Sequence, residues 1–308
     1  HYGSSDLDNL DLNPILTKID DGKVYDYHSE KKRNEVPKTL DDLFEKDGKD
    51  FIHSGQKIEL TYNIQNTLRT IGTKISSFIT RHYGMNSLSE DHVTLKLRGS
   101  AGQSLGAFAV KGLTLKVFGD ANDYVGKGMN GGKIVISSSA EYASHDTPSV
   151  LAGNTALYGA TGGELYVGGC VGERFAVRNS GASAVIEGAG DHCCEYMTGG
   201  HVTVLGNVGS NFGAGMTGGF AYVLDTKRRF FDQCNRSLVN LDRIVSEEME
   251  SHRKFLKQII ARHIKETNSE RAKLILDEFD RYAPSFWLVS PTALNIQDLL
   301  KATTANAA

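Results

Sequence analysis

The sequence predicts an all-β core, a right-handed parallel β-helix solenoid with flanking α-helices. The first observation is a short apolar segment that recurs between residues 113 and 225 and ends on glycine each time. Its copies are LTLKVFG at Leu113–Gly119, ELYVGG at Glu164–Gly169, SAVIEG at Ser183–Gly188 and HVTVLG at His201–Gly206. The second is a glycine that returns at intervals of 18, 19 and 19 residues, at Gly163, Gly181, Gly200 and Gly219. A unit this short, without a helix, cannot bury its own apolar face, so the units must stack into a solenoid.

The strand segments alternate as half-buried strands do. In Leu113–Phe118, Leu, Leu and Val face one side while Thr, Lys and Phe face the other, which predicts a bore filled by aliphatic side chains. Glycine pairs stand at Gly131-Gly132, Gly162-Gly163, Gly199-Gly200 and Gly218-Gly219. We interpret the glycines as corners that need positive φ, or as places where stacked coils leave no room for a Cβ. The longer interval from Gly132 to Gly163 predicts an insertion of roughly twelve residues near 137–149.

Two segments precede the solenoid. Residues 1–50 are polar and predict an extended N-terminal arm, with one short helix opened by a capping box at Thr39–Asp42. Residues 51–92 predict a strand at Lys57–Asn63 and then an amphipathic helix, with apolar residues at helical spacing from Leu68 until Gly84 ends it. We expect this lead-in to cap the solenoid, because the open end of a solenoid is an unpaired sheet edge.

The β-helix is expected over residues 93–226, with its first coil at Val93. We place its end near residue 226 because no glycine occurs after Gly219. Residues 227–308 predict a C-terminal helical segment, with a capping box at Thr267–Glu270 before the second helix and a short strand or extended segment at Phe286–Val289. The apolar stripes of the two helices are Met249, Leu256, Ile259, Ile260 and Ile264, and Leu274, Ile275 and Phe279. We expect both stripes to pack on the solenoid, because burying large apolar side chains stabilises the fold. If the stripes were exposed, they would instead mark a docking surface.

The composition limits the possible partners and compartment. A formal net charge of −3, from 34 basic and 37 acidic residues, gives no electrostatic reason to expect nucleic acid or an anionic membrane. No apolar run is long enough to cross a bilayer. The four cysteines form neither a CxxC motif nor a disulfide framework, which predicts an intracellular, reducing compartment, the cytoplasm or an organelle. The chain begins at His1 rather than Met, which favours a fragment or a processed product.

Several motifs resemble nucleotide or metal sites, and each has a structural interpretation. Gly126–Gly131 and Gly213–Gly218 match the glycine pattern of a dinucleotide loop, but each precedes a strand rather than a helix that would hold a pyrophosphate. Ala121–Gly128 resembles a phosphate-binding loop but lacks its first glycine and its hydroxyl residue. In Asp191–Glu195 (DHCCE), neighbouring side chains point to opposite faces of a strand. We therefore predict no catalytic, cofactor-binding or metal-binding residue.

Longer strings give the chain a resemblance to a known family. They are GSAGQSLGAF at Gly99–Phe108, GDANDYVGKG at Gly119–Gly128, AGNTALYGATGG at Ala152–Gly163, GERFAVRNSG at Gly172–Gly181 and NFGAGMTGG at Asn211–Gly219. A further string is NIQNTLRTIG at Asn63–Gly72. Together these strings resemble the C-terminal domain of the large (α) subunit of glutamate synthase, which is named for its G-x-G repeats. The resemblance covers roughly residues 55–290. The β-helix subunit of formylmethanofuran dehydrogenase is the alternative family.

The resemblance implies a parent protein that makes glutamate from glutamine and 2-oxoglutarate with electrons from NAD(P)H or ferredoxin. It places a glutaminase domain, an FMN-binding synthase domain and an iron–sulfur cluster elsewhere in the same polypeptide, with an NAD(P)H-oxidising β subunit or domain as a further partner. This chain is then expected to hold those domains in register and to be non-catalytic alone. No cofactor is expected in the chain itself.

The residues expected to contact those domains lie in polar loops at coil corners. They are Asp120, Asn122, Asp123, Lys127, Glu173, Arg174, Arg178 and Asn179. These side chains could also satisfy the backbone groups of stacked turns, and the sequence leaves both interpretations open. Two other functions stay open as well, a binding subunit of another redox complex and an enzyme that cleaves polysaccharide in a groove of the solenoid. The single Trp and the scattered loop carboxylates argue against the enzyme.

Overall fold

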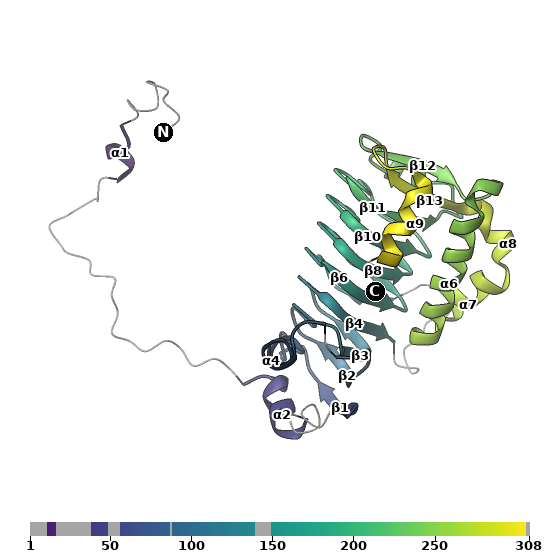
Figure 1. Ribbon diagram of the computed structural model, residues 1–308. Coiled ribbons are helices and arrows are strands. Elements are labelled where there is room, and N and C mark those ends of the chain that lie inside the picture. Colours follow the sequence, from purple (N-terminus) through teal and green to yellow (C-terminus); the bar gives the residue numbers. More distant parts are fainter. Residues whose placement is uncertain (1–10, 17–37, 49–55, 87, 139–148, 306–308) are drawn as a thin grey trace. The chain divides into compact units, whose positions relative to one another are not determined.

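The structure is a computed structural model that describes residues 11–16, 38–48, 56–86, 88–138 and 149–305 (Figure 1). It divides into two compact units, residues 1–37 and residues 38–308. In the first unit the described residues include the short helix α1 (Asn13–Leu16), which is exposed throughout. The second unit contains the sheet and all the other helices described.

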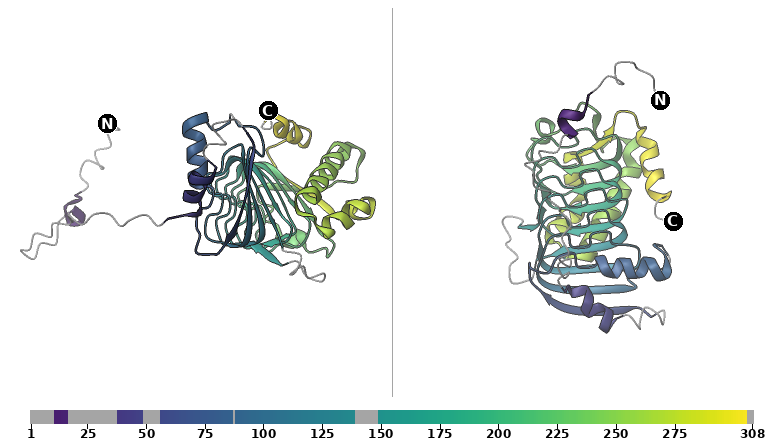
Figure 2. Two further views of the ribbon diagram at one scale, coloured as in Figure 1. Left: turned by 90° about the horizontal axis from the view of Figure 1, so that it is seen from below. Right: turned by 90° about the vertical axis from the view of Figure 1, so that its left-hand side faces the viewer.

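The second unit is built on a 13-stranded sheet. Its main column pairs in parallel, one strand per coil, in the order β1 (Ile58–Ile64), β2 (Val93–Ala101), β3 (Leu113–Ala121), β4 (Asn130–Ser137), β6 (Gly162–Val167), β8 (Ser180–Ile186), β10 (Thr198–Val204) and β11 (Gly218–Leu224). A second column of short strands, β5 (Val150–Ala152), β7 (Cys170–Val171) and β9 (Gly188–Ala189), continues from the end of β3. The stacked coils (Figure 2) confirm the parallel β-helix with flanking helices.

The sheet begins one strand before Val93, where we expected the first coil. β1 pairs with β2 along its full length, from Ile58 beside Val93 to Ile64 beside Gly99. Both isoleucines are buried in the core that fills the bore. The strand joins the sheet because the outer edge of β2 would otherwise leave a row of backbone N–H and C=O groups without partners.

The lead-in helix is α4 (Thr73–Tyr83), and it lies beside α2 (Leu40–Asp47) near the first coils (Figure 1). It begins later than the apolar spacing suggested, because Gly72 ahead of it has a φ of 94° and donates its N–H to the buried Asp41 carboxylate at 2.8 Å. Gly84 ends the helix as predicted, with a φ of 79°. The isoleucines of α4 are buried in the same core as the bore.

The bore is aliphatic, as the alternation predicted. Leu113, Leu115 and Val117 each expose 1% or less of their surface. On the outer face of the same strand, Phe118 is 38% exposed and Lys116 is half-buried.

The corners contain a repeated backbone pattern that is only partly glycine. In each coil three alternate residues have positive φ: Ser104, Gly106 and Phe108; Tyr124, Gly126 and Gly128; Thr155, Leu157 and Gly159; Arg174, Ala176 and Arg178; His192, Cys194 and Tyr196; Asn211, Gly213 and Gly215. Their N–H groups bond to neighbouring coils in alternate directions. Arg174 and Arg178 donate forward to Asp191 and Glu195, whereas Ala176 donates back to Ala156. Bonds on both sides hold non-glycine residues in a conformation that glycine would adopt more easily.

The far end of the solenoid is closed by antiparallel strands. β13 (Phe286–Pro291) pairs with β11, and β12 (Val239–Arg243) pairs with β13. The strand at Phe286–Val289 was expected, whereas β12 has no counterpart among the predicted elements. The shorter helices here are α5 (Phe230–Gln233), α8 (Phe279–Tyr282) and α9 (Ile296–Ala305). Within the described ranges, no helix is both long enough and apolar enough to cross a bilayer.

Two helices, α6 (Glu250–Thr267) and α7 (Glu270–Asp277), pack on the outer face of the sheet. The shared core includes Val135, Tyr166, Val185, Leu205 and Tyr222 from the strands and Leu256, Ile260, Ala272, Ile275 and Phe279 from the helical segment. This confirms the expected packing on the solenoid, with two corrections. Leu274 is 49% exposed, because α7 turns Ala272 and Ile275 toward the sheet instead. Ser269 caps α7 by accepting the Ala272 N–H at 3.0 Å, whereas Thr267 is the last residue of α6.

A pair of leucine substitutions tests this packing. Leu256→Ala is expected to lower the free energy of unfolding by about 2–5 kcal/mol, because Leu256 is fully buried between α6 and the sheet. Leu274→Ala removes the same atoms from an exposed site and should change stability by less than about 0.5 kcal/mol. Urea unfolding followed by circular dichroism measures both. Equal losses for the two variants would contradict the packing.

Candidate functional site

The two polar loops predicted to contact other domains lie on one corner of the solenoid, with a single coil between them. Asp123 Oδ1 accepts the backbone N–H of Asn154 at 2.7 Å, and Asn154 Oδ1 accepts the backbone N–H of Glu173 at 2.8 Å. This ladder joins the loops through the intervening coil. Some of their polar atoms therefore satisfy stacked backbone, in agreement with the second of the two sequence interpretations.

The first loop is largely occupied within the chain. The carboxylates of Asp120 and Asp123 accept hydrogen bonds from side chains of the preceding coil, at 3.0 and 3.3 Å. Asn122 and Lys127 are half-buried, and the Lys127 ammonium lies 5.5 Å from the centre of the Tyr124 ring. The two carboxylates therefore help to hold neighbouring coils together.

The second loop is more available. Glu173, Arg174 and Arg178 are exposed. Asn179 has no exposed surface: its side chain bonds to the backbone of Gly181 and Ala182 at 2.9–3.2 Å, so it shapes the turn and cannot reach a partner.

The two exposed arginines are held in strained backbone. Arg174 and Arg178 have φ values of 58° and 56°. At the position of Arg178, other coils have Gly128, Gly159 and Gly215. A non-glycine residue in this region costs about 1–2 kcal/mol. Neither guanidinium forms an ion pair within the described part of the chain. The strain therefore presents cationic side chains that this part of the chain does not use.

Exposed aromatic residues occupy the same coil position as Arg178. Phe108 and Tyr196 are 57% and 58% exposed, with φ values of 59° and 53°. Each ring covers the glycine of the next coil, since a Cβ at Gly128 or Gly215 would lie 2.7 or 2.5 Å from it. We call Phe108, Arg174, Arg178 and Tyr196 the corner face. Aromatic and arginine side chains are enriched in protein interfaces. The two aromatics were not among the predicted contact residues, although their shared place in the repeat is visible in the sequence.

A second feature, the glycine groove, runs along the corner of the paired glycines and has a volume of about 1160 Å³. Its floor contains the glycine pairs and the polar residues at the corresponding point of each coil, Lys111, Asn130, Thr161, Ser180, Thr198 and Thr217. The wall beside this floor contains Glu90, Asp91, Arg262, residues 293–295, Asp298 and Leu299. The glycines were predicted to form corners, but the groove was not predicted, because its second wall comes from segments that are distant in the sequence.

One row of outward side chains crosses the floor of the groove in register. In strand order it is Thr114, Lys133, Glu164, Ser183, His201 and Phe220. The first coils therefore give the groove a charged end, and the last coils give it an aromatic end. Residues 293–299 follow β13, the neighbour of β11, and add Leu294, which is 41% exposed, to the aromatic end.

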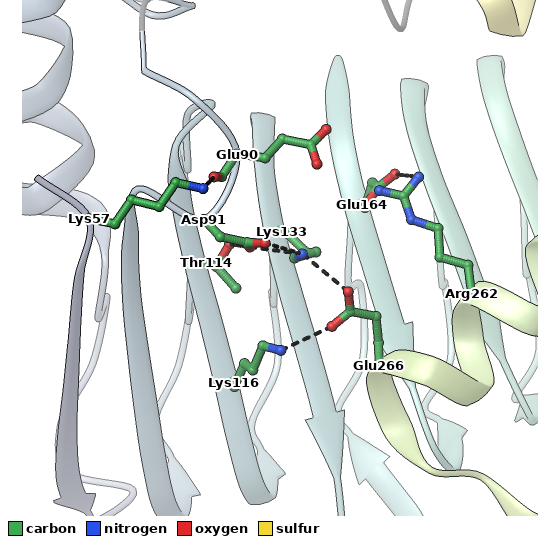
Figure 3. Close-up of polar contacts among 9 residues, drawn as sticks. All are labelled: Lys57, Glu90, Asp91, Thr114, Lys116, Lys133, Glu164, Arg262 and Glu266. Carbon is green, nitrogen blue, oxygen red and sulfur yellow. Dashed lines mark hydrogen bonds and ion pairs between the residues drawn. The ribbon is translucent and has the colours of Figure 1, made fainter.

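Figure 3 shows the charged end, where α6 reaches the sheet. Lys133 Nζ lies 2.8 Å from Asp91 Oδ1 and 3.2 Å from Glu266 Oε1, and Glu266 Oε2 lies 3.1 Å from Lys116 Nζ. Burial would raise the pKa of Glu266, but the two lysines outweigh it and hold that pKa below its usual value. Glu266 is therefore ionised at neutral pH and ties the last turn of α6 to two strands.

A second ion pair lies further along the groove. Arg262 Nη1 lies 2.7 Å from Glu164 Oε1. Burial raises the pKa of Glu164, and the Arg262 guanidinium opposes the shift. The exposed side chain of Glu90 points into the same space (Figure 3), and its carboxylate forms no ion pair within the described residues. The groove thus contains one carboxylate without an ion pair of its own among the described residues, beside the Arg262 guanidinium that already pairs with Glu164.

His201 marks the transition to the aromatic end. It is 8% exposed, with its ring stacked on Phe220 and edge-on to Phe255 at centroid distances of 5.7 and 5.2 Å. Burial lowers the pKa of His201 to about 4, so the imidazole is neutral at physiological pH. Its Nδ1 has no hydrogen-bond partner among the described residues. A neutral imidazole here can donate one hydrogen bond and accept another.

Potential metal ligands are not clustered in the described residues. No group of three or more His, Cys, Asp or Glu within them could hold a metal ion. Cys193 and Cys194 are buried thiols with their sulfur atoms 3.8 Å apart, and an iron–sulfur cluster needs more thiolates than this. The dinucleotide-like loops at Gly126–Gly131 and Gly213–Gly218 lead into β4 and β11, which confirms them as corners.

The chain matches one family model, described as the GXGXG motif, over residues 41–292. It is 49% identical over 289 residues to the glutamate synthase [NADPH] large chain of Azospirillum brasilense, which covers 94% of this chain and 19% of the relative. It is 50% identical over 238 residues to the ferredoxin-dependent glutamate synthase of Pyropia yezoensis, covering 77% of this chain and 15% of that protein. The Bacillus subtilis glutamate synthase [NADPH] large chain is 48% identical over 78% of this chain and 16% of its own length. The chain thus spans less than a fifth of each of these relatives.

Proposed function

This chain belongs to the GXGXG motif family, and on that basis we propose that it is the C-terminal structural domain of a glutamate synthase large chain. One observation carries the proposal. Nearly the whole chain, 94%, matches the Azospirillum relative at 49% identity, yet it matches only 19% of that protein. The parent protein would form glutamate from glutamine and 2-oxoglutarate, with the chemistry in the other four-fifths of the polypeptide.

The relatives also support a role that does not depend on the electron donor. Its identity to an enzyme named for NADPH and to one named for ferredoxin is almost the same, 49% and 50%. A domain that selected the electron donor would be expected to differ between the two. In our proposal the FMN, the iron–sulfur cluster and the glutaminase nucleophile belong to the remaining domains, and an NAD(P)H-oxidising β subunit is a further partner. This domain holds the glutaminase and synthase domains in register.

The corner face is the surface proposed to contact those domains. Its arginines and aromatic rings are exposed, lie on one side of the solenoid, and are held in strained backbone where glycine would suffice. A β-helix is stiff along its length because every coil bonds to its neighbours. Such a body can set the distance between two domains that dock on it.

A chimera tests the proposed function. The matching segment of the Azospirillum large chain is replaced by this chain, and glutamine- and 2-oxoglutarate-dependent NADPH oxidation is measured. We expect the chimera to be active and the relative without the segment to be inactive, because its catalytic domains would lose their common support. A truncated relative as active as the whole enzyme would refute the structural role.

The purified chain provides the complementary measurement. Residues 1–308 alone should neither release ammonia from glutamine nor oxidise NAD(P)H, and should show no flavin absorbance. Turnover by the pure chain would instead favour an enzyme that works within the solenoid. Flavin bound at one equivalent would contradict the assignment of FMN to the remaining domains.

A further inference from the structure

The glycine groove has the shape of a site for an extended polypeptide. Its floor crosses the six strands β3, β4, β6, β8, β10 and β11. Neighbouring strands lie about 4.8 Å apart, so the floor is about 24 Å long. An extended chain rises about 3.3 Å per residue. The groove therefore accommodates about seven residues.

The lining of the groove disfavours other elongated ligands. Its acidic side chains, Glu90, Asp91, Glu164 and Asp298, outnumber its basic ones, Lys111, Lys133 and Arg262. A polyanion such as nucleic acid would meet net repulsion. The aromatic side chains of the lining, His201 and Phe220, are both buried, so no exposed ring is available for a sugar to stack on.

Polar groups along the groove suit a polypeptide backbone. Four hydroxyl residues recur once per coil on the floor and are exposed: Thr161, Ser180, Thr198 and Thr217. Hydroxyls both donate and accept, as the N–H and C=O groups of an extended segment require.

The charges in the groove determine which side chains a bound segment needs. Among the described residues Glu90 is the groove carboxylate without an ion pair of its own, and it points into the space beside Glu164 and Arg262, which already pair with each other (Figure 3). A Lys or Arg side chain of the segment would complete this end. Leu294 is 41% exposed at the other end. The β6 and β11 coils are three strand spacings apart, about 14 Å, so about four residues separate the cation from an apolar side chain.

We propose that the glycine groove binds an extended segment of the remaining part of the same parent polypeptide, with a basic residue beside Glu90 and an apolar residue beside Leu294. The inference rests on the proposed function, in which about four-fifths of the polypeptide lies outside this chain. The corner face and the groove would then engage the parent protein on two corners of the solenoid.

Synthetic 15-residue peptides that tile the rest of the Azospirillum large chain, together with one of residues 17–37 of this chain, are the probes. Each is labelled with a fluorophore and titrated with purified residues 1–308, and binding is read by anisotropy. We expect peptides that overlap in one basic and apolar segment to bind. This readout needs no catalytic activity, so the chimera result and the peptide result can fail separately.

Two variants assign the binding to the groove. Glu90→Lys should weaken it at least about fivefold, whereas Glu248→Lys, an equal charge change at an exposed residue outside both the groove and the polar loops, should leave it unchanged. Thr198→Trp should abolish binding by filling the floor, with the circular dichroism spectrum unchanged. Binding to none of the tiled peptides, binding unaffected by Glu90→Lys and Thr198→Trp, or tighter binding of the 17–37 peptide would each overturn the proposal.

Discussion

Gly200→Val is expected to lower the free energy of unfolding by at least about 3 kcal/mol. Gly200 has a φ of 76°, and a Cβ there would lie 2.2 Å from the carbonyl oxygen of Ala182. That oxygen belongs to the backbone of the stacked strand β8, so it cannot retreat without breaking bonds between coils. Valine adds strain, because β-branched residues rarely adopt positive φ. Gly219→Val should behave alike, since its Cβ would lie 2.6 Å from the Gly200 carbonyl oxygen.

Gly159→Val is the matched control. Gly159 has a φ of 62°, but nothing lies within 4 Å of the position that a Cβ would take. The free energy of unfolding of this variant should fall only by the cost of a non-glycine residue at positive φ, about 1–2 kcal/mol. Urea unfolding of the three proteins separates steric contact from conformational strain. Equal losses at residues 159 and 200, or no loss at residue 200, would rule out close coil stacking as the reason for the glycine pairs.

The fold was predictable because the stacking of coils requires glycine at a regular interval, and that interval is visible in the sequence. Gly199 and Gly218 have no room for a Cβ against the preceding coil, so glycine returns at each of these corners. The opposite corner was less readable. Leu157, Ala176 and Cys194 have the same positive φ as Gly126 and Gly213, because a hydrogen bond from each N–H to a carbonyl of the preceding coil holds them there. Where hydrogen bonds between coils hold a residue at positive φ, glycine is not required, so the sequence does not reveal the conformation.

The ends of the solenoid were less predictable for a related reason. β1 and β12 join the sheet by pairing with a strand edge, and edge pairing requires backbone rather than any particular side chain. The glycine groove was beyond the sequence for a different reason. Its walls meet in ion pairs between residues as far apart as Glu164 and Arg262, and such pairs form only once α6 lies on the sheet. The exposed arginines of the second polar loop were identifiable, but the burial of Asn179 was not, because asparagine is usually exposed.

The double charge reversal Arg174→Glu with Arg178→Glu, made in the chimeric enzyme, is expected to raise the ratio of glutamine hydrolysed to glutamate formed at least about fivefold. If the corner face holds the glutaminase and synthase domains in register, like charge in place of the two cations loosens that contact. Glutamine would still be hydrolysed, but less of its nitrogen would reach the synthase domain. The isolated chain should keep its stability within about 0.5 kcal/mol, because both side chains are exposed.

Replacing the same arginines by glycine separates contact from folding. Arg174→Gly and Arg178→Gly relieve strain at φ values of 58° and 56°, so each should raise the free energy of unfolding by up to about 1 kcal/mol. The ratio of hydrolysis to synthesis should nevertheless rise, since the cations are gone. As a control, Lys254→Glu with Arg281→Glu makes the same charge change on side chains that are 73% and 75% exposed on α6 and α8, and should leave the ratio unchanged. If the ratio of glutamine hydrolysed to glutamate formed stays at the wild-type value in both sets of arginine variants, the corner face is not part of the interface. If the glycine variants are more stable but hydrolyse more glutamine per glutamate formed, the strained arginines serve contact with a partner domain.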